Sequence, residues 1–299
     1  MNSILQAIGQ QSYTELDRQK IAKLNWAECG VDFGYIIFIT GRCGSTWLTH
    51  LIEDTGLCGA PHEFFNPDSL RYFNKCIQAN LFTEYFESIV RQFSKGRRFG
   101  FQINCEKLRH FQELVDVKLL FPPDHRAYFW MTRQDIFSQA YSFARAKMSG
   151  HWHSFEYENK SYSIGTPNPD LTLDDLSIWK EVLLLISQER QFEAYARENN
   201  LCFTKLNYEQ MVTDRTVVAL SILAILGCEI ASSASCLLSA VNKTKKLEVG
   251  NKYRELIPFF EKYRDIIVKI MQERDSITWD NLCEMLIVEY QFTKKQLTS

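Results

Sequence analysis

Apolar runs alternate with stretches of helical spacing along most of the chain. Four short runs, rich in β-branched and aromatic residues, are typical of buried strands: residues 35–40, 98–104, 126–132 and 201–206. Apolar residues recur with helical periodicity between and beside these runs, over residues 47–55, 70–94, 108–120, 136–149 and 176–199. Strands that alternate with helices in this way predict an α/β fold with a parallel sheet covered on both faces.

Two segments, residues 1–30 and 154–170, do not follow this alternation, and we expect them to be additions to a single domain. Residues 1–30 predict an N-terminal helical arm, in which Thr14 caps a helix and Asp17 follows three residues later. Residues 154–170 are polar and contain glycine and proline near their end, so we expect a flexible loop or lid there. Neither an internal repeat nor a linker is evident, and we therefore expect a single domain over residues 1–299.

Composition argues against several classes of function. The formal net charge of −2 gives no overall attraction to nucleic acid, so we expect no nucleic-acid partner. The nine cysteines include no Cys-x-x-Cys pair, which argues against a metal site and favours a reducing, cytoplasmic location. Residues 216–242 hold one charged residue, but Gly227 and several serines interrupt the stretch. We therefore expect two buried helices there, the first ending near Gly227, rather than a membrane-spanning segment.

The turn after the first strand is the most informative part of the chain. Residues 41–46 read GRCGST and lead into a helix that begins near Trp47. A glycine turn before a helix directs backbone N–H groups at an anion. Arg42 adds a fixed positive charge, and Ser45 and Thr46 add hydroxyl donors. The turn therefore predicts a site for a phosphate-bearing nucleotide or an equivalent oxyanion.

This turn is not a Walker A motif. Only two residues separate Gly41 from Gly44, and no lysine follows. A P-loop kinase or NTPase remains an alternative, as do a non-catalytic nucleotide-binding protein and an ordinary strand-to-helix turn. A thiol in an anion-binding loop can have a lowered pKa, but no base lies beside Cys43 in the sequence, so we expect it to be passive.

Further polar residues lie where ligands gather in a parallel sheet, at the carboxyl ends of strands. Arg133 directly follows the third strand, and Ser138 and Ser142 share one face of the next helix. We expect this group to bind a phosphate. The alternatives are an ion pair between Arg133 and Asp135 or a nearby glutamate, and serines that are ordinary hydroxyls on the helix surface. A lysine cluster ending at Lys246 is either a solvated helix end or a clamp over a nucleotide phosphate.

Glu63 is the candidate general base. Pro61 and Phe64 flank it, and an apolar setting raises the pKa of a carboxyl group, which suits proton abstraction. His62 is the second candidate. Adjacent residues of an extended loop point in opposite directions, so we expect only one of the two to face the site. The alternative for Glu63 is a surface carboxylate in a turn.

Five motifs in this order carry a resemblance to a known family: FITGRCGSTWL, GLCGAPHEFF, FGFQIN, TRQDIFSQAYSFARAKMSGHWH and LNYEQM. They resemble the sulfotransferase superfamily that uses 3′-phosphoadenosine-5′-phosphosulfate (PAPS), and most closely its bacterial trehalose sulfotransferase-like family. The resemblance implies a three-layer α/β sandwich with a central parallel sheet, the P-loop NTPase-like sulfotransferase fold. It also implies PAPS as co-substrate, a small-molecule acceptor, no metal, and a homodimer.

The resemblance implies a role for each matching residue. Residues 42–47 would hold the 5′-phosphosulfate, with Arg42 stabilising charge on the leaving group. Arg133 and Ser142 would hold the 3′-phosphate. Glu63 would take the proton of the acceptor hydroxyl.

The chain also departs from the trehalose enzymes. Gly41 replaces a glutamine, Ala60 replaces an acidic residue, and Gln102 stands where a basic residue is common. The first two departures argue against trehalose as the acceptor, and Gln102 leaves one less charge near the site. A glycan, a lipid-linked alcohol and a hydroxylated or nitrogen-rich secondary metabolite remain open, so transfer to an amine is also open.

Overall fold

The computed structural model describes residues 2–150, 152–157, 160–164, 172–229, 240–241, 244–246 and 252–298. The chain forms two compact units. The first unit consists of Met1–Ile39, Gly44–Thr132 and Ala196–Thr244, and the second of Thr40–Cys43, Arg133–Tyr195 and Lys245–Ser299. The expectation of a single domain over residues 1–299 stays a prediction.

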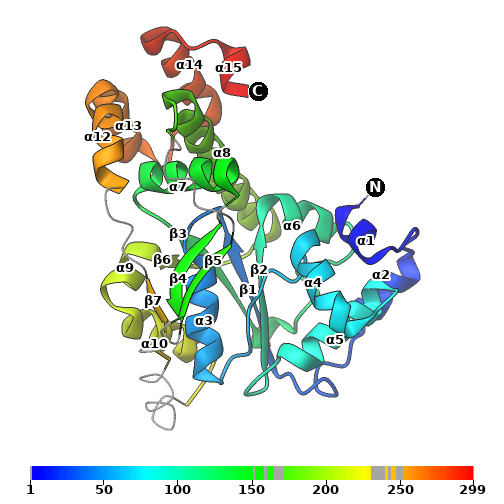
Figure 1. Cartoon of the computed structure of the whole chain (residues 1–299). Coiled ribbons are helices and arrows are strands. Elements are labelled where there is room, and N and C mark those ends of the chain that lie inside the picture. The colour runs from blue at the N-terminus through cyan, green and yellow to red at the C-terminus, as the bar shows by residue number, and fades with distance from the viewer. Residues whose placement is uncertain are drawn as a thin grey trace. The chain divides into compact units, whose positions relative to one another are not determined.

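A four-stranded parallel sheet forms the centre of the first unit (Figure 1). The order β2-β1-β3-β6 places β1 (Phe33–Ile39) between β2 (Arg98–Asn104) and β3 (Arg126–Thr132), with β6 (Phe203–Asn207) outside β3. All residues of β1 after Phe33 are buried, and because side chains alternate along a strand, both faces of β1 are covered. The α/β class with a parallel sheet is confirmed, and β2 and β3 have the expected bounds.

The helices of the first unit whose bounds the structure describes are α1 (Ser3–Ile8), α2 (Glu15–Ala22), α3 (Ser45–Thr55), α4 (Pro67–Ile77), α5 (Phe82–Phe93), α6 (Cys105–Gln112), α9 (Tyr208–Thr213) and α10 (Arg215–Ile225). Helices α1 and α2 lie within residues 1–30, and an N-terminal helical arm over this range stays a prediction. Thr14 caps α2, and it forms the reciprocal capping box with Asp17 that the sequence suggested. The helix expected to end near Gly227 is α10, and Gly227 has a φ of 66°.

Two helical expectations in this unit were wrong. Residues 70–94 form α4 and α5 rather than one helix, because the Asn74 side chain bonds both the N–H and the carbonyl of Ala79. The helix expected over residues 108–120 is α6, which begins earlier because Asn104 caps it, accepting from the Lys107 N–H at 3.0 Å. Helix α6 ends at Gln112, and turns follow it.

The second unit is mostly helical. Its helices are α7 (Ile136–Ser149), α8 (Asp175–Asn199), α12 (Lys252–Lys262), α13 (Arg264–Glu273), α14 (Trp279–Tyr290) and α15 (Lys294–Thr298). Helix α7 has the bounds expected from the sequence. The core is aromatic: the ring of Trp179 lies 5.3 Å from those of Phe259 and Tyr263, and all three side chains are buried. Such aromatic pairs stabilise a core beyond their buried area.

A second sheet, in the order β5-β4-β7, includes part of the segment expected to be a loop. Strands β4 (His153–Tyr157) and β5 (Lys160–Ile164) pair antiparallel, and β7 (Thr244–Lys246) lies next to β4. In this part of the sequence, polar residues alternate with aromatic ones, a pattern that suits a strand. The loop expectation relied on the polar composition and overlooked this alternation. Residues 158–159 and 165–171 lie outside the described residues, and a lid role for this segment stays a prediction.

None of the helices that the structure describes combines the length and the apolar content needed to cross a bilayer. Residues 230–239, where the second helix after Gly227 was expected, lie outside this part of the chain.

Candidate functional site

Two left-handed residues shape the loop between β1 and α3. Arg42 has a φ of 62° and Gly44 a φ of 95°. Left-handed residues other than glycine are uncommon and concentrate at ligand-binding sites. A Cβ on Gly44 would lie 2.6 Å from the ring of Tyr208, and one on Gly41 would lie 2.5 Å from the ring of Phe143. Packing against aromatic rings therefore requires both glycines, a reason that the loop pattern alone did not reveal.

In the second unit, Arg42, Arg133 and Ser142 form an arginine cluster. The Arg42 Nε donates to Ser142 Oγ at 3.0 Å, and an Arg133 N–H donates to the Arg42 carbonyl at 3.5 Å. Burial and the neighbouring Arg133 charge lower the pKa of Arg42. No carboxylate forms an ion pair with Arg42 within the described residues. A desolvated cation beside a second cation is stabilised by a bound anion.

Helix α7 contains both candidate serines, and their surroundings differ. Asp135 caps the helix, accepting from the Ser138 N–H at 2.9 Å. Ser142 lies at the arginine cluster. The Ser138 side chain is fully buried, and its hydroxyl oxygen has no hydrogen-bond partner among the residues described. The structure therefore joins Ser142 to Arg42 and does not join Ser138 to them.

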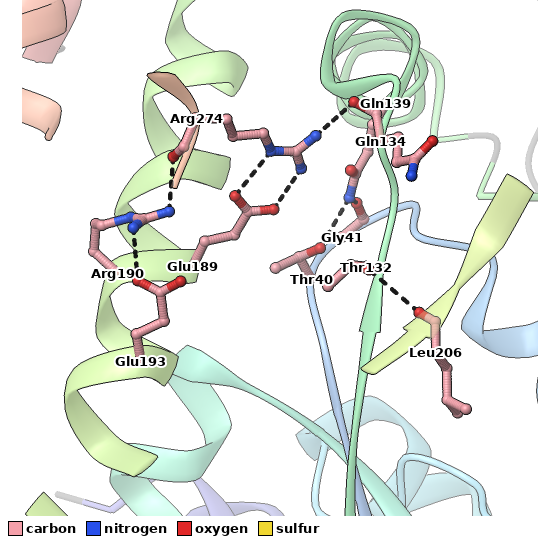
Figure 2. Close-up of polar contacts among 10 residues, drawn as sticks. All are labelled: Thr40, Gly41, Thr132, Gln134, Gln139, Glu189, Arg190, Glu193, Leu206 and Arg274. Carbon is pink, nitrogen blue, oxygen red and sulfur yellow. Dashed lines mark hydrogen bonds and ion pairs between the residues drawn. The ribbon is translucent and has the colours of Figure 1, made fainter. Parts of the chain in front are cut away.

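Gln139 anchors the loop to α7, as Figure 2 shows. Its Nε2 donates to Thr40 Oγ1 at 2.9 Å and to the Gly41 carbonyl at 2.7 Å. Both hydrogen bonds are buried or partly buried, so losing them would leave acceptors without water to replace the donor. Gln139 therefore fixes the backbone immediately before Arg42.

A buried ion pair anchors the turn that carries Arg133 (Figure 2). Arg274 donates to both carboxylate oxygens of Glu189, at 3.2 and 2.6 Å, and to the Gln134 carbonyl at 2.5 Å. The Glu189 side chain is only 6% exposed, so this bidentate pair is strongly held. The residue after Arg133 is thus tied to α8 and to the end of α13. Sequence patterns gave no sign of this contact, since 85 positions separate Glu189 from Arg274.

Glu63 lies between α3 and α4 in the first unit. Its carboxylate accepts from Asn66 Nδ2 at 3.5 Å. Burial raises the pKa of Glu63, while the Asn66 hydrogen bond and the Lys107 charge oppose this rise. The direction of the shift agrees with the expectation from its apolar neighbours.

Lys107 is a residue that the sequence interpretation missed. It lies in the first turn of α6, its side chain is only 15% exposed, and its Nζ is 2.9 Å from Glu106 Oε1. The expected helix began after it, so Lys107 drew no attention. The available signal was Asn104, a good N-cap residue at the end of β2.

His62 faces a different environment from Glu63. Its Nε2 is 3.8 Å from Glu53 Oε2, and burial lowers its pKa. Its ring centroid lies 5.5–5.9 Å from those of three phenylalanines, Phe64, Phe73 and Phe93. The two candidate bases therefore have separate partners, as expected for adjacent residues in an extended segment.

Gln102 organises the start of α3 and the segment that leads to Glu63. Its Nε2 donates to the Ser45 carbonyl at 2.9 Å and to Thr49 Oγ1 at 2.7 Å. Thr49 Oγ1 in turn donates to the Pro61 carbonyl at 3.0 Å. The Gln102 side chain, which stands where a basic residue is common in the resembling family, has a structural role here.

Replacing this buried amide by leucine (Gln102→Leu) is expected to lower the free energy of unfolding by about 1–3 kcal/mol, because the Ser45 carbonyl loses its buried donor. Urea unfolding measures the change. The control is Gln191→Leu, whose amide donates only to Ser187 Oγ in an exposed contact, and which should leave stability unchanged. Equal midpoints for Gln102→Leu and wild type would show that the network contributes nothing.

The other loop residues have distinct settings. Ser45 and Thr46 begin α3 and are partly exposed, whereas Cys43 is buried. Trp47 is also buried, and the Arg215 guanidinium lies 5.6 Å from its ring centroid. Arg215 is a further cation near the loop's helical end that sequence reasoning did not single out.

The remaining candidates are only partly covered by the structure. Lys246 is the last residue of β7, and its side chain lies outside the described part. Within the residues described, no group of three or more His, Cys, Asp or Glu side chains is arranged to hold a metal ion.

Comparisons with known proteins place this geometry in context. Residues 34–97 and 115–255 match the family model described as Stf0 sulphotransferase. A similar solved structure is the sulfotransferase domain from the Synechococcus PCC 7002 olefin synthase, which is 16% identical with a TM-score of 0.37. That likeness covers 67% of this chain and 74% of the other. No curated protein matches the chain. The family match includes Arg42, Glu63 and Arg133, but neither Gln102 nor Lys107.

Proposed function

Because the chain belongs to the Stf0 sulphotransferase family, we propose that it transfers the sulfuryl group of PAPS to a hydroxyl of a small-molecule or glycan acceptor. Sulfuryl transfer itself follows from the family. The donor, the acceptor class and the residue roles are the proposal. The arginine cluster carries it, because the partly buried Arg42 lies beside the buried Arg133, and no carboxylate among the described residues forms an ion pair with Arg42. Two neighbouring positive charges in this setting suit a ligand bearing several phosphate or sulfate groups.

In this proposal, the arginine cluster binds the donor. Arg133 and Ser142 bind the 3′-phosphate, the group that distinguishes PAPS from ATP-like ligands. Arg42 and the first N–H groups of α3, with the Ser45 and Thr46 hydroxyls, bind the 5′-phosphosulfate. A helix N-terminus and a guanidinium are both suited to phosphate oxygens. We also propose that Lys246 contacts the donor. Ser138, which is fully buried in α7, is proposed to pack within the helix core rather than to contact the donor.

PAPS supplies an activated sulfur, and the acceptor oxygen attacks it in line with the departing phosphate oxygen. Glu63 accepts the proton of the acceptor hydroxyl, and its raised pKa brings it closer to the proton affinity that this step requires. Arg42 stabilises the negative charge that grows on the leaving phosphate. Positioning and charge stabilisation provide the catalysis, as in the related transfer of phosphoryl groups.

The test is transfer of labelled sulfate from PAPS to a panel of acceptors, read by mass spectrometry. The panel contains sugars, lipid-linked alcohols, hydroxylated small molecules and amines. Transfer to one acceptor, with release of adenosine 3′,5′-bisphosphate, supports the proposal. Failure to bind adenosine 3′,5′-bisphosphate in calorimetry would overturn it. The homodimer and the cytoplasmic location stay predictions.

Removing the lysine charge (Lys107→Met) is expected to move the acid limb of the kcat/KM profile to higher pH. A general base acts only when deprotonated, so the rate falls as pH drops through its pKa. The Lys107 charge lowers the pKa of Glu63, and its loss therefore raises that pKa further. The pH profile of sulfate transfer measures the limb.

The control for this experiment is Lys118→Met, an exposed lysine whose loss should leave the limb in place. Calorimetric binding of adenosine 3′,5′-bisphosphate over the same pH range separates an effect on the base from one on the donor site. If the acid limb of Lys107→Met lies at the same pH as that of wild type, then Lys107 does not influence the pKa of Glu63 or Glu63 is not the base.

A further inference from the structure

Two cysteines that are 170 positions apart in the sequence meet in the first unit. The Sγ atoms of Cys58 and Cys228 are 3.3 Å apart, within hydrogen-bond distance for thiols. Cys58 is fully buried, whereas Cys228 is partly exposed. Cys228 is thus accessible to a reagent in solution, and the Cys58 thiol lies in contact with it in the interior.

The backbone around each cysteine is held in place. The Tyr35 hydroxyl, itself buried, donates to the Cys58 carbonyl at 2.8 Å. Arg98, at the start of β2, donates to the Leu226 carbonyl at 2.7 Å and to the Gly227 carbonyl at 2.6 Å, immediately before Cys228. Once one of two adjacent thiols forms a mixed disulfide, the other attacks that disulfide far more readily than a thiol in solution does.

The surroundings also favour a thiolate on the accessible cysteine. A hydrogen bond from the Cys58 thiol and the nearby Arg98 charge lower the pKa of Cys228 to about 7, although burial opposes this. The same hydrogen bond and burial raise the pKa of Cys58. Cys228 is therefore the nucleophile at neutral pH, since the thiolate is the reactive form.

We propose that Cys58 and Cys228 form a reversible disulfide, with a small-molecule disulfide such as oxidised glutathione as the oxidant. The Cys228 thiolate attacks one glutathione sulfur, which forms a mixed disulfide and releases one glutathione thiolate. Cys58 then loses its proton and attacks the Cys228 sulfur, which breaks the mixed disulfide and releases the second glutathione. The two protein thiols are oxidised, one glutathione disulfide is reduced to two glutathiones, and these take up the two protons.

The link would join the segment that precedes Glu63 to the end of α10. It would close a long loop of the chain, which restricts the unfolded state and raises stability. This site is independent of the sulfuryl-transfer proposal, because neither thiol belongs to the residues assigned to the donor or the acceptor.

The experiment maps disulfides in the full chain after incubation with oxidised glutathione. Free thiols are alkylated, the protein is digested without reduction, and peptides are identified by mass spectrometry. The expected result is one linked peptide pair containing Cys58 and Cys228, which dithiothreitol separates. The oxidised protein should also melt roughly 5–15 °C higher than the reduced protein.

Variants separate the two steps. Cys58→Ser should stop the reaction at a mixed disulfide between Cys228 and glutathione, whereas Cys228→Ser should leave Cys58 free and remove the rise in melting temperature. Cys202→Ser, at an exposed cysteine, is the control and should keep the link. The proposal is overturned if wild-type Cys58 and Cys228 are both alkylated, or if Cys228 pairs instead with Cys236, which lies outside the described residues.

Discussion

Glu63→Gln is expected to lower kcat about 10²–10⁴-fold while the affinity for adenosine 3′,5′-bisphosphate stays the same. The amide keeps the shape of the carboxylate and can still accept the Asn66 hydrogen bond, but it cannot take a proton. Glu63 is also partly buried, which limits how far solvent water can substitute for the lost base. Steady-state transfer of labelled sulfate gives kcat, and calorimetry gives the affinity.

The matched control is Asp68→Asn, a neighbouring carboxylate whose side chain is 92% exposed, and which should leave both quantities unchanged. If Glu63→Gln turned over at the wild-type rate, Glu63 would not be the base. His62→Asn would then decide the second candidate, because burial keeps the pKa of His62 low and its imidazole neutral.

Arg133→Ala is expected to weaken binding of PAPS and of adenosine 3′,5′-bisphosphate by about 10²-fold or more, and by the same factor. Both ligands carry the 3′-phosphate that this side chain is proposed to hold. Arg133 is 7% exposed, and truncating one partner of a buried charged contact costs about 2–5 kcal/mol. Calorimetric titration measures both affinities.

Adenosine 5′-phosphosulfate, which lacks the 3′-phosphate, provides the sharpest comparison and should bind wild type and Arg133→Ala alike. Arg145→Ala is the control variant: it removes an arginine of α7 that forms an ion pair with Glu255, and it should bind all three ligands as wild type does. A loss of affinity in Arg133→Ala that was equal with and without the 3′-phosphate would place this arginine elsewhere in the donor site.

Hydrophobic periodicity predicted those elements whose burial is uniform. Strands β2 and β3 are buried along almost their whole length, and their bounds were predicted without error. The break between α4 and α5 was missed because it depends on a polar contact, the Asn74 side chain on Ala79, rather than on apolar spacing. Periodicity identifies the face of a helix more reliably than it identifies the residue where the helix stops.

The candidate site was predicted as separate parts and not as contacts. The motif order indicated that Arg42, Arg133 and Ser142 bind phosphate, but assigned Arg42 and Ser142 to opposite ends of the nucleotide. In the structure, a hydrogen bond joins these two side chains. One sequence cannot show which side chains meet across 100 positions, because that depends on how α7 packs against the loop. Lys107 was missed for the same reason, since its electrostatic effect on Glu63 depends on where α6 begins.

The contacts of Arg274 with Glu189 and Gln134 limit how the chain can be truncated or joined to parts of other proteins. The match to the family model ends at residue 255, and Arg274 lies beyond that end. Arg274 nevertheless neutralises Glu189 and donates a hydrogen bond to the carbonyl of Gln134, the residue after Arg133. A fragment cut at the family boundary would leave a stranded carboxylate in the interior of the second unit. Chimaeras and minimal versions must therefore carry the C-terminal helices with them.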